Sequence, residues 1–267
     1  MATALRAQHT RLQPQFQNNA FGRPLVLLSS ESADSLTGDI YAVVPYPFAT
    51  VSAAMQSPAH WCEVMILHIN TKYCRAVAGP QGASLRVYIG TKTPQTLAAA
   101  TRVAFAYQES ITTESYFAIN LSAQDGPLGT SNYRIHLEAV ALPNQQSFLH
   151  FTYAYDVGFA GQLAMQTYLA TLGAGKVGFT PVSPGADGQP GYVAGVRGVV
   201  ERNTMRYYLA IDSFLASQQY PADQRLEKSL QAWFSATELY PRQLHEVDRS
   251  DYLEMKRAEV VRQQTPD

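Results

Sequence analysis

Five runs of the sequence alternate apolar and polar residues: LRVYIGTK (85–92), RVAFAYQE (102–109), YFAINLSA (116–123), NYRIHLEAVAL (132–142) and SFLHFTYAYDV (147–157). Side chains in a β-strand point to opposite faces with a period of two, so each run places its apolar set on one face of a sheet. The breaks between runs are short and carry turn-forming residues such as Pro94, Gly126 and Pro143, as an antiparallel meander requires. The stretch therefore predicts one antiparallel sheet with an apolar face that another part of the chain must cover.

The composition is that of a globular chain with a sizeable core. Of the 267 residues, 46% are hydrophobic, and the net charge is only −1 because Lys and Arg (20) nearly balance Asp and Glu (21). This balance, without a basic run, predicts no binding to nucleic acid. No run of about 18 apolar residues is present, so no transmembrane segment is expected. The 16 Tyr and 11 Phe suit either a packed core or a pocket for an apolar ligand.

The elements before the meander are predicted from the same periodicities. Residues 2–28 predict a short helix and a lead-in strand. Four elements follow: a strand at Leu36–Val44, helices at Phe48–Gln56 and Ala59–Val64, and a strand at Met65–Val77. Pro45 and Pro47 end the first of these strands, since proline cannot donate to a strand ladder.

Helical spacing dominates after residue 157. Gly158–Leu172 is apolar nearly all round and predicts a buried helix, and Gly173–Gly191 is a loop rich in Gly and Pro. Tyr192–Ser217 is the strongest amphipathic helix, and its Arg197 and Glu201 are spaced for a surface ion pair.

The C-terminal part predicts helices at Ala222–Leu239 and Asp248–Gln263. The last helix is highly charged, so we expect it on the outside of the protein. The expected organisation is an N-terminal extension (1–28), one α+β domain (29–217) and a helical extension packed on that domain (218–267).

The order of strand, two short helices, meander and long helix resembles the helix-grip fold of START-related and Bet v 1-like proteins. The segment Gly38–Phe48, continued through Ser57–Cys62, looks like the opening of that family, where a strand runs into a helix that ends near a Pro and a Trp. The resemblance covers about Leu36–Ser217. It implies a curved antiparallel sheet of about six to seven strands around helix Tyr192–Ser217, with a cavity for an apolar ligand between them. The family shares no catalytic residues.

The function implied by this resemblance is non-catalytic binding or transport of a lipid or other apolar small molecule. The residues expected to line the cavity are Phe105, Tyr107, Phe117, Ile119, Ile135, Phe151 and Tyr153 on the sheet, and Val196, Val200, Tyr207 and Ile211 on the helix. Arg134 and His136, in one row with Glu138, would orient a polar head group; the alternative is that this polar side of the meander faces solvent. Arg206 would pair with an anionic ligand; the alternative is that the polar run of residues 201–206 forms a structural ion-pair network. The same apolar residues form an ordinary core if the cavity is collapsed. No catalytic residue, metal site or cofactor is predicted.

Two other classes of function stay open. An enzyme of the cyclase or hydrolase type needs a titratable group with a strongly shifted pKa in the pocket, such as His136, Glu138 or His68. A protein-interaction module would combine a filled core with an exposed apolar patch, most readily at Trp233 and Phe234. The segment 173–178 matches G-x-G-x-x-G, but it follows a predicted helix and not a strand, so a loop or pocket lid is the better interpretation.

The two cysteines, Cys62 and Cys74, cannot complete a zinc site alone. A disulfide is expected if the chain is exported, and buried thiols if it is cytoplasmic. The N-terminus has no apolar core of a signal peptide, but Ala-Thr-Ala-Leu at residues 2–5 resembles a mature N-terminus after cleavage. We expect a periplasmic or secreted protein whose signal has been removed, with the cytoplasm as the alternative.

Overall fold

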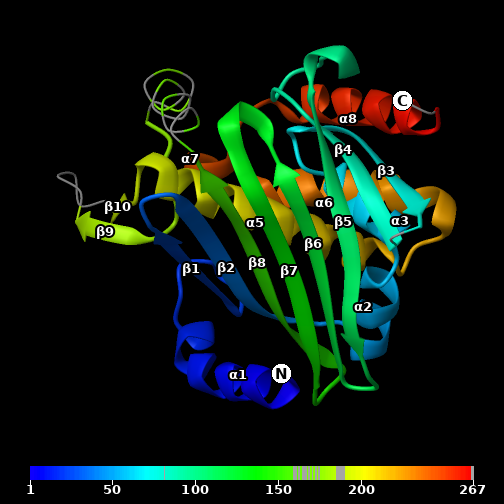
Figure 1. Ribbon diagram of the computed structural model, residues 1–267. Coiled ribbons are helices and arrows are strands. Elements are labelled where there is room, and N and C mark those ends of the chain that lie inside the picture. Colours follow the sequence, from blue (N-terminus) through cyan, green and yellow to red (C-terminus); the bar gives the residue numbers. More distant parts are fainter. Residues whose placement is uncertain are drawn as a thin grey trace.

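Eight strands form one antiparallel sheet in the order β1-β2-β8-β7-β6-β5-β4-β3 (Figure 1). The computed structural model describes residues 1–80, 82–158, 161, 163, 167, 169, 171, 173, 175–184 and 190–265. The strands are β1 (Leu25–Glu31), β2 (Ser35–Val44), β3 (Thr71–Gly79), β4 (Gly82–Ile89), β5 (Thr101–Thr112), β6 (Tyr116–Asp125), β7 (Thr130–Leu142) and β8 (Gln146–Val157). The last strand of the meander, β8, pairs with β2 and thereby joins the meander to the first part of the chain.

The alternation of the five runs sets the register of the sheet. Between β6 and β7, Ile119 lies opposite Leu137 and Leu121 lies opposite Ile135, and each of the four is at most 1% exposed. The predicted meander is confirmed. The sheet has eight strands and not six or seven, because the lead-in strand β1 pairs along its whole length with β2.

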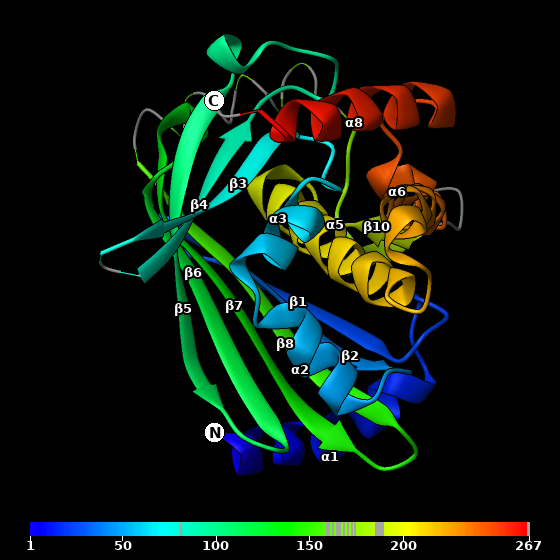
Figure 2. The same ribbon diagram turned by 90° about the vertical axis from the view of Figure 1, so that its right-hand side faces the viewer.

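One long helix, α5 (Gly195–Ser217), crosses the inner face of the curved sheet, beside α2 (Phe48–Met55) and α3 (Pro58–Met65) (Figure 2). The approach of α5 to β2 depends on Gly38, because a Cβ at that position would collide with the Thr204 side chain. This is the predicted α+β helix-grip architecture.

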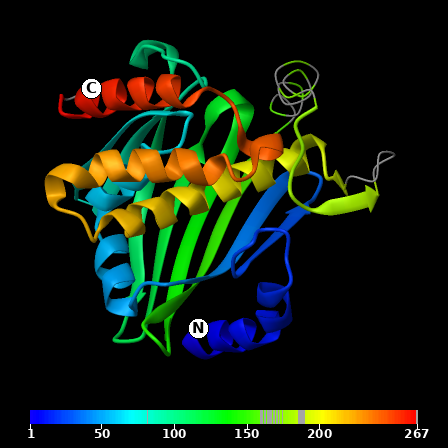
Figure 3. The same cartoon turned by 180° about the vertical axis from the view of Figure 1, so that it is seen from behind.

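Three more helices follow α5: α6 (Ala222–Thr237), α7 (Pro241–Leu244) and α8 (Arg249–Gln263). Figure 3 shows α6 running alongside α5, and α8 lying above both. As predicted, the last helix lies at the edge of the molecule (Figure 3), where residues such as Arg257 are exposed. Its inner face is nevertheless part of the core: Tyr252 and Lys256 are completely buried, because α8 packs against β3 and α6.

The outer face of the sheet is partly covered by the N-terminal helix α1 (Ala2–Gln17). Its Leu5, Leu12 and Phe16 form a second, smaller core with Val140 and Phe148 of the sheet. These two strand residues alternate with residues of the main core, so the sheet buries part of both faces.

Two predicted segments need correction. Of Met65–Val77, only the part from Thr71 is strand. Residues 66–70 continue from α3 as turns, in which the N–H of His68 bonds to the carbonyl of Met65 and the N–H of Thr71 to that of His68. The predicted loop Gly173–Gly191 contains a short hairpin of β9 (Pro181–Pro184) and β10 (Pro190–Tyr192).

The predicted buried helix Gly158–Leu172 lies largely outside the described residues. Its Leu163, which the structure does describe, is 61% exposed and so does not contribute to a core. Over the residues described here, none of the helices has the length and apolar character needed to span a bilayer.

The two cysteines form a disulfide. Cys62 of α3 and Cys74 of β3 have their sulfur atoms 1.99 Å apart. The bond joins one of the helices on the inner face directly to an edge strand of the sheet.

Candidate functional site

The apolar residues predicted to line a cavity meet in one hydrophobic core between the sheet and α5. Nine of them are buried there: Phe105, Phe117, Ile119, Ile135, Phe151, Tyr153, Val200, Tyr207 and Ile211. Tyr107 and Val196 are partly buried and pack against the edge of this core. The side chains expected to surround a ligand therefore contact one another.

Four tyrosines form the centre of this core, and we refer to Tyr133, Tyr153, Tyr155 and Tyr207 as the tyrosine cluster. Ring centroids of Tyr153 lie 5.5 Å from Tyr155 and 5.2 Å from Tyr207, while Tyr133 stacks on Tyr155 at 5.2 Å. Burial raises the pKa of all four phenols above its usual value, so each keeps its O–H group at neutral pH. The interior is thus aromatic, with hydroxyl groups inside it.

A hollow of about 230 Å³ opens where the β1–β2 turn meets the end of β8 and the first turn of α5. Its lining consists of residues 31–36 together with Val157 and Val196. Leu36 and Val157 belong to the same core as the tyrosine cluster, and Val196 packs against that core. We call this hollow the mouth, because its inner wall is the apolar interior.

A second hollow of about 260 Å³ lies between α5 and α6. It is lined by polar residues such as Ser213, Lys228 and Arg249 and includes none of the predicted site residues. It does not reach the sheet.

The prediction that Arg134 and His136 line the interior is wrong. Both residues alternate with the buried Ile135 along β7, so they point to the opposite face of the sheet. Arg134 pairs there with Asp156 at 3.0 Å and its side chain is 43% exposed. The Nδ1 atom of His136 lies 2.7 Å from Oδ1 of Asn120.

His150 is the centre of a polar network on this outer face. Its Nδ1 lies 2.9 Å from Glu138 Oε1 and its Nε2 lies 2.9 Å from Asp39 Oδ1, while its ring stacks on Tyr41. Burial alone would lower the pKa of His150, but the hydrogen bonds to the two carboxylates raise it to about 8. Burial would likewise raise the pKa of Glu138, but the neighbouring His136, 3.8 Å away, and the hydrogen bonds from His150 and Tyr116 lower it. These shifted groups lie away from the interior, so they do not supply it with an acid or a base.

The polar run on α5 holds the preceding loop in place. Glu201 accepts hydrogen bonds from the backbone N–H groups of Phe179 and Thr180, at 2.5 and 2.9 Å. Arg202 donates to the carbonyl of Val177 at 3.2 Å. The interpretation of this run as a structural network is confirmed for these two residues. Arg197 does pair with Glu201, at 3.9 Å, but Glu201 is completely buried and not on the surface.

Three cations converge on one carboxylate, Glu246, between α7 and α8. Glu246 Oε1 lies 2.5 Å from Arg206 and 2.7 Å from Lys92, and Oε2 lies 3.5 Å from Lys176. The Glu246 side chain is only 8% exposed. Burial would raise its pKa, but the three cations lower it. We call these four residues the Glu246 site. Arg206 thus points to the C-terminal helices and not, as expected, toward the sheet.

The Lys of the G-x-G-x-x-G segment is part of this site. Besides facing Glu246, Lys176 donates to the carbonyl of His245 at 2.5 Å. The segment therefore ties a loop to the C-terminal helices, which agrees with its interpretation as a loop and not as a phosphate cradle.

His68 contacts Tyr207 of the tyrosine cluster and lies near Arg206 and Lys92 of the Glu246 site. Its ring is 3% exposed and stacks on Tyr207, with centroids 4.5 Å apart. Its Nδ1 accepts a hydrogen bond from the backbone N–H of Asn70 at 3.2 Å, so the other ring nitrogen carries the proton. That atom, Nε2, is buried and makes no hydrogen bond within the part of the chain that the structure describes.

The charges around His68 keep it neutral. Burial and the neighbouring cations lower its pKa well below the usual value; these cations are Arg206, Lys256, Lys92 and Lys72. A neutral imidazole with Nδ1 occupied offers a single N–H donor through Nε2.

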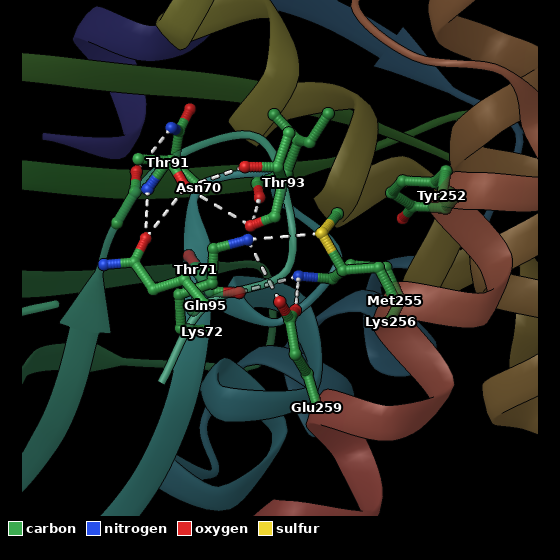
Figure 4. A network of polar contacts seen from close by, with 12 residues as sticks. Asn70, Thr71, Lys72, Thr91, Thr93, Gln95, Tyr252, Met255, Lys256 and Glu259 are labelled. Carbon is green, nitrogen blue, oxygen red and sulfur yellow. Dashed lines mark hydrogen bonds and ion pairs between the residues drawn. The ribbon is translucent and has the colours of Figure 1, made fainter. Parts of the chain in front are cut away.

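A second buried network adjoins this region (Figure 4). Glu259 of α8 binds Lys72 of β3 at 3.0 Å and Lys256 at 2.6 Å, and each of the three side chains is at most 2% exposed. Lys256 also donates to the carbonyls of His68 and Thr71. Burial lowers the pKa of Lys256 to about 8.

Most of these groups have no signal in the sequence. Lys92, Lys176 and Glu246 lie in three separate loops, far from one another and from His68 along the chain. Only the fold brings them together, so spacing along the chain could not have found the site. Over the described ranges, no three His, Cys, Asp or Glu side chains are grouped so as to hold a metal ion.

No family model and no curated protein sequence matches the chain. Solved structures similar to it include a conserved protein from Geobacillus kaustophilus (TM-score 0.39, 10% identity, 68% of this chain and 96% of that chain). Others are Ara h 8.0201 (TM-score 0.39, 12% identity, 68% and 99%) and human StAR-related lipid transfer protein 5 (TM-score 0.35, 10% identity, 63% and 88%). At such identities and TM-scores the likeness carries no conclusion about this chain. Its own eight-stranded antiparallel sheet, curved around α5, has the helix-grip arrangement.

Proposed function

We propose that the protein binds a lipid or other apolar small molecule, without catalysis, between the sheet and α5. The observation that carries this proposal is the mouth, the hollow of about 230 Å³ that ends on Leu36, Val157 and Val196. Small-molecule sites are concave and mostly apolar, with a few polar groups that orient the ligand. Leu36 of the mouth lies opposite Tyr155 of the tyrosine cluster across β2 and β8, and the hydroxyl groups of that cluster are polar groups of this kind.

Binding requires the interior to open further. Ligand pockets usually have volumes of roughly 300–1,000 Å³, which is more than the mouth offers. Beyond the mouth, the rings of Tyr153, Tyr155 and Tyr207 are in contact. A bound molecule would therefore displace these rings or move α5 away from the sheet. The contacts that it breaks are replaced by contacts with its own apolar surface.

A solvatochromic dye tests this proposal. We expect Nile red, which is uncharged, to bind the purified protein saturably and to be displaced by dodecanol. In Val196→Trp the larger side chain fills the mouth, so the affinity for Nile red should fall by at least about tenfold. Val182→Trp is the matched control, because Val182 is 58% exposed on β9 and lies outside the mouth. Equal dye affinities of Val196→Trp and the wild type would speak against this route into the interior.

A protein-interaction module is the second candidate, and the closed core favours it. The apolar patch expected at Trp233 and Phe234 of α6 is not exposed. Trp233 is only 3% exposed, and Phe234 packs partly into the main core. Failure of every apolar probe to bind would leave this candidate as the better one.

We further propose that the protein works in an oxidising compartment, in the periplasm or outside the cell. The disulfide between Cys62 and Cys74 supports this, because such bonds persist in oxidising compartments and are rare in the cytosol. Thiol labelling of the protein in intact source cells should find neither cysteine reactive. Labelling of both would rule this location out.

A further inference from the structure

We propose that the ligand carries an anionic oxygen group, a carboxylate or a phosphate, which binds to His68, Lys92 and Arg206. We also propose that Glu246 holds the place of this group until the ligand arrives. This inference rests on the proposed function, since it identifies the head group of the molecule whose apolar part enters the interior.

The first observation is the concentration of positive charge. Lys92, Lys176 and Arg206 all reach the single carboxylate of Glu246. Cations so close together repel one another, and a carboxylate among them is strongly favoured. An incoming carboxylate or phosphate offers the same interactions as Glu246, and a phosphate offers additional oxygen atoms.

The second observation is the buried N–H group of His68. Leaving a buried donor without an acceptor costs about 1–3 kcal/mol, so such a group calls for an explanation. Its surroundings are cationic, and they disfavour another donor and favour an acceptor that carries negative charge. An anionic oxygen is such an acceptor.

The third observation is the connection to the apolar interior. The ring of His68 stacks on Tyr207, and Tyr207 contacts Tyr153 and Phe151. A polar end at His68 and an apolar path through the tyrosine cluster together fit an amphipathic molecule. A free inorganic anion would use only the polar end.

Glu246 is well placed to leave the site. It lies in the short linker of residues 245–248 between α7 and α8, outside the sheet and α5. The linker is held by Lys176, which binds the carbonyl of His245, and by Arg206, which binds the carbonyl of Leu244 at 3.5 Å. Displacing Glu246 would thus move a linker that touches the main core through the partly buried Val247 and the neighbouring Leu244.

The test compares two probes that share an apolar chain, dodecanoate and dodecanol, by titration calorimetry. We expect the wild type to prefer dodecanoate. Glu246→Gln removes the competing charge, so it should raise the affinity for dodecanoate by about tenfold and leave that for dodecanol unchanged. Lys92→Met, at a partly exposed position, should abolish the preference. Glu238→Gln is the matched control, since Glu238 pairs with His245, whereas Arg206 binds Glu246.

Each outcome decides the inference separately from the proposed function. If both probes bind equally to the wild type and to Glu246→Gln, the interior binds ligands but the anionic site is refuted. A third probe, inorganic phosphate, covers the case in which neither amphiphile binds. If phosphate then raises the melting temperature of Glu246→Gln saturably, and that of Glu238→Gln does not change, the anion site stands and the proposed function fails. No effect of phosphate on either variant overturns the inference.

Discussion

Replacing Glu259 by glutamine is expected to lower the free energy of unfolding by about 3–5 kcal/mol, the usual cost of removing one partner from a buried ion pair. Glu259 is the carboxylate that Lys72 and Lys256 both bind, at 3.0 and 2.6 Å. In the variant the two ammonium groups would stay buried side by side without a counter-charge. Glutamine keeps the size of the side chain, so the loss reports the charge and not a cavity.

The matched control is the same substitution in an exposed pair. Glu227 of α6 binds Arg257 of α8, the helix that also carries Glu259. The distance is 2.6 Å, but the two side chains are 39% and 52% exposed. Exposed pairs contribute roughly 0–1 kcal/mol, so Glu227→Gln should change the stability little. Urea unfolding, followed by circular dichroism at neutral pH, measures both. Similar losses in the two variants would mean that the buried network does not hold α8 on the sheet.

The second large effect is a loss of stability between pH 6.5 and 9 that depends on His150. The pKa of His150 is raised from 6.5 to about 8 in the folded protein. Its contribution is therefore complete below pH 6.5 and is lost as the pH rises through 8. A shift of this size corresponds to about 2 kcal/mol. The groups around its ring include Asp39, Glu138, Tyr41, Thr152 and His136.

Comparison with His150→Gln isolates this contribution from other groups that titrate. The difference in unfolding free energy between wild type and variant should be about 2 kcal/mol larger at pH 6 than at pH 9. His245→Gln serves as the control, because its side chain is 45% exposed and its pairing with Glu238 should contribute little. A difference for His150→Gln that does not vary with pH would contradict the account of the outer-face network.

Most of the fold could be predicted because the controlling signals are local. A period of two places Ile119, Leu121 and Ile135 on one face whatever the partner strands are, and antiparallel pairing then follows from short turns. The long apolar stripe of α5 likewise required a sheet to cover. The resemblance to helix-grip proteins supplied the relation between these two parts.

The site was predicted only in part, and the reasons are physical. Arg134 and His136 share a strand with Ile135, and the alternation that buries Ile135 directs both of them to the other face. The charged helix α8 was expected on the outside because charge usually means exposure. Its Glu259 is neutralised by Lys72, which lies 187 residues earlier in the chain. Pairs of this kind are not visible in the local pattern of a sequence.

The most direct measurement of the central claim is native mass spectrometry of the freshly purified full chain, followed by extraction of what it carries. We predict a bound mass that is lost on denaturation, and an extract that contains an amphipathic molecule with an acidic group. A protein that shows only its own mass and takes up none of a panel of fatty acids, phospholipids and sterols would contradict the claim that the space between the sheet and α5 binds a ligand.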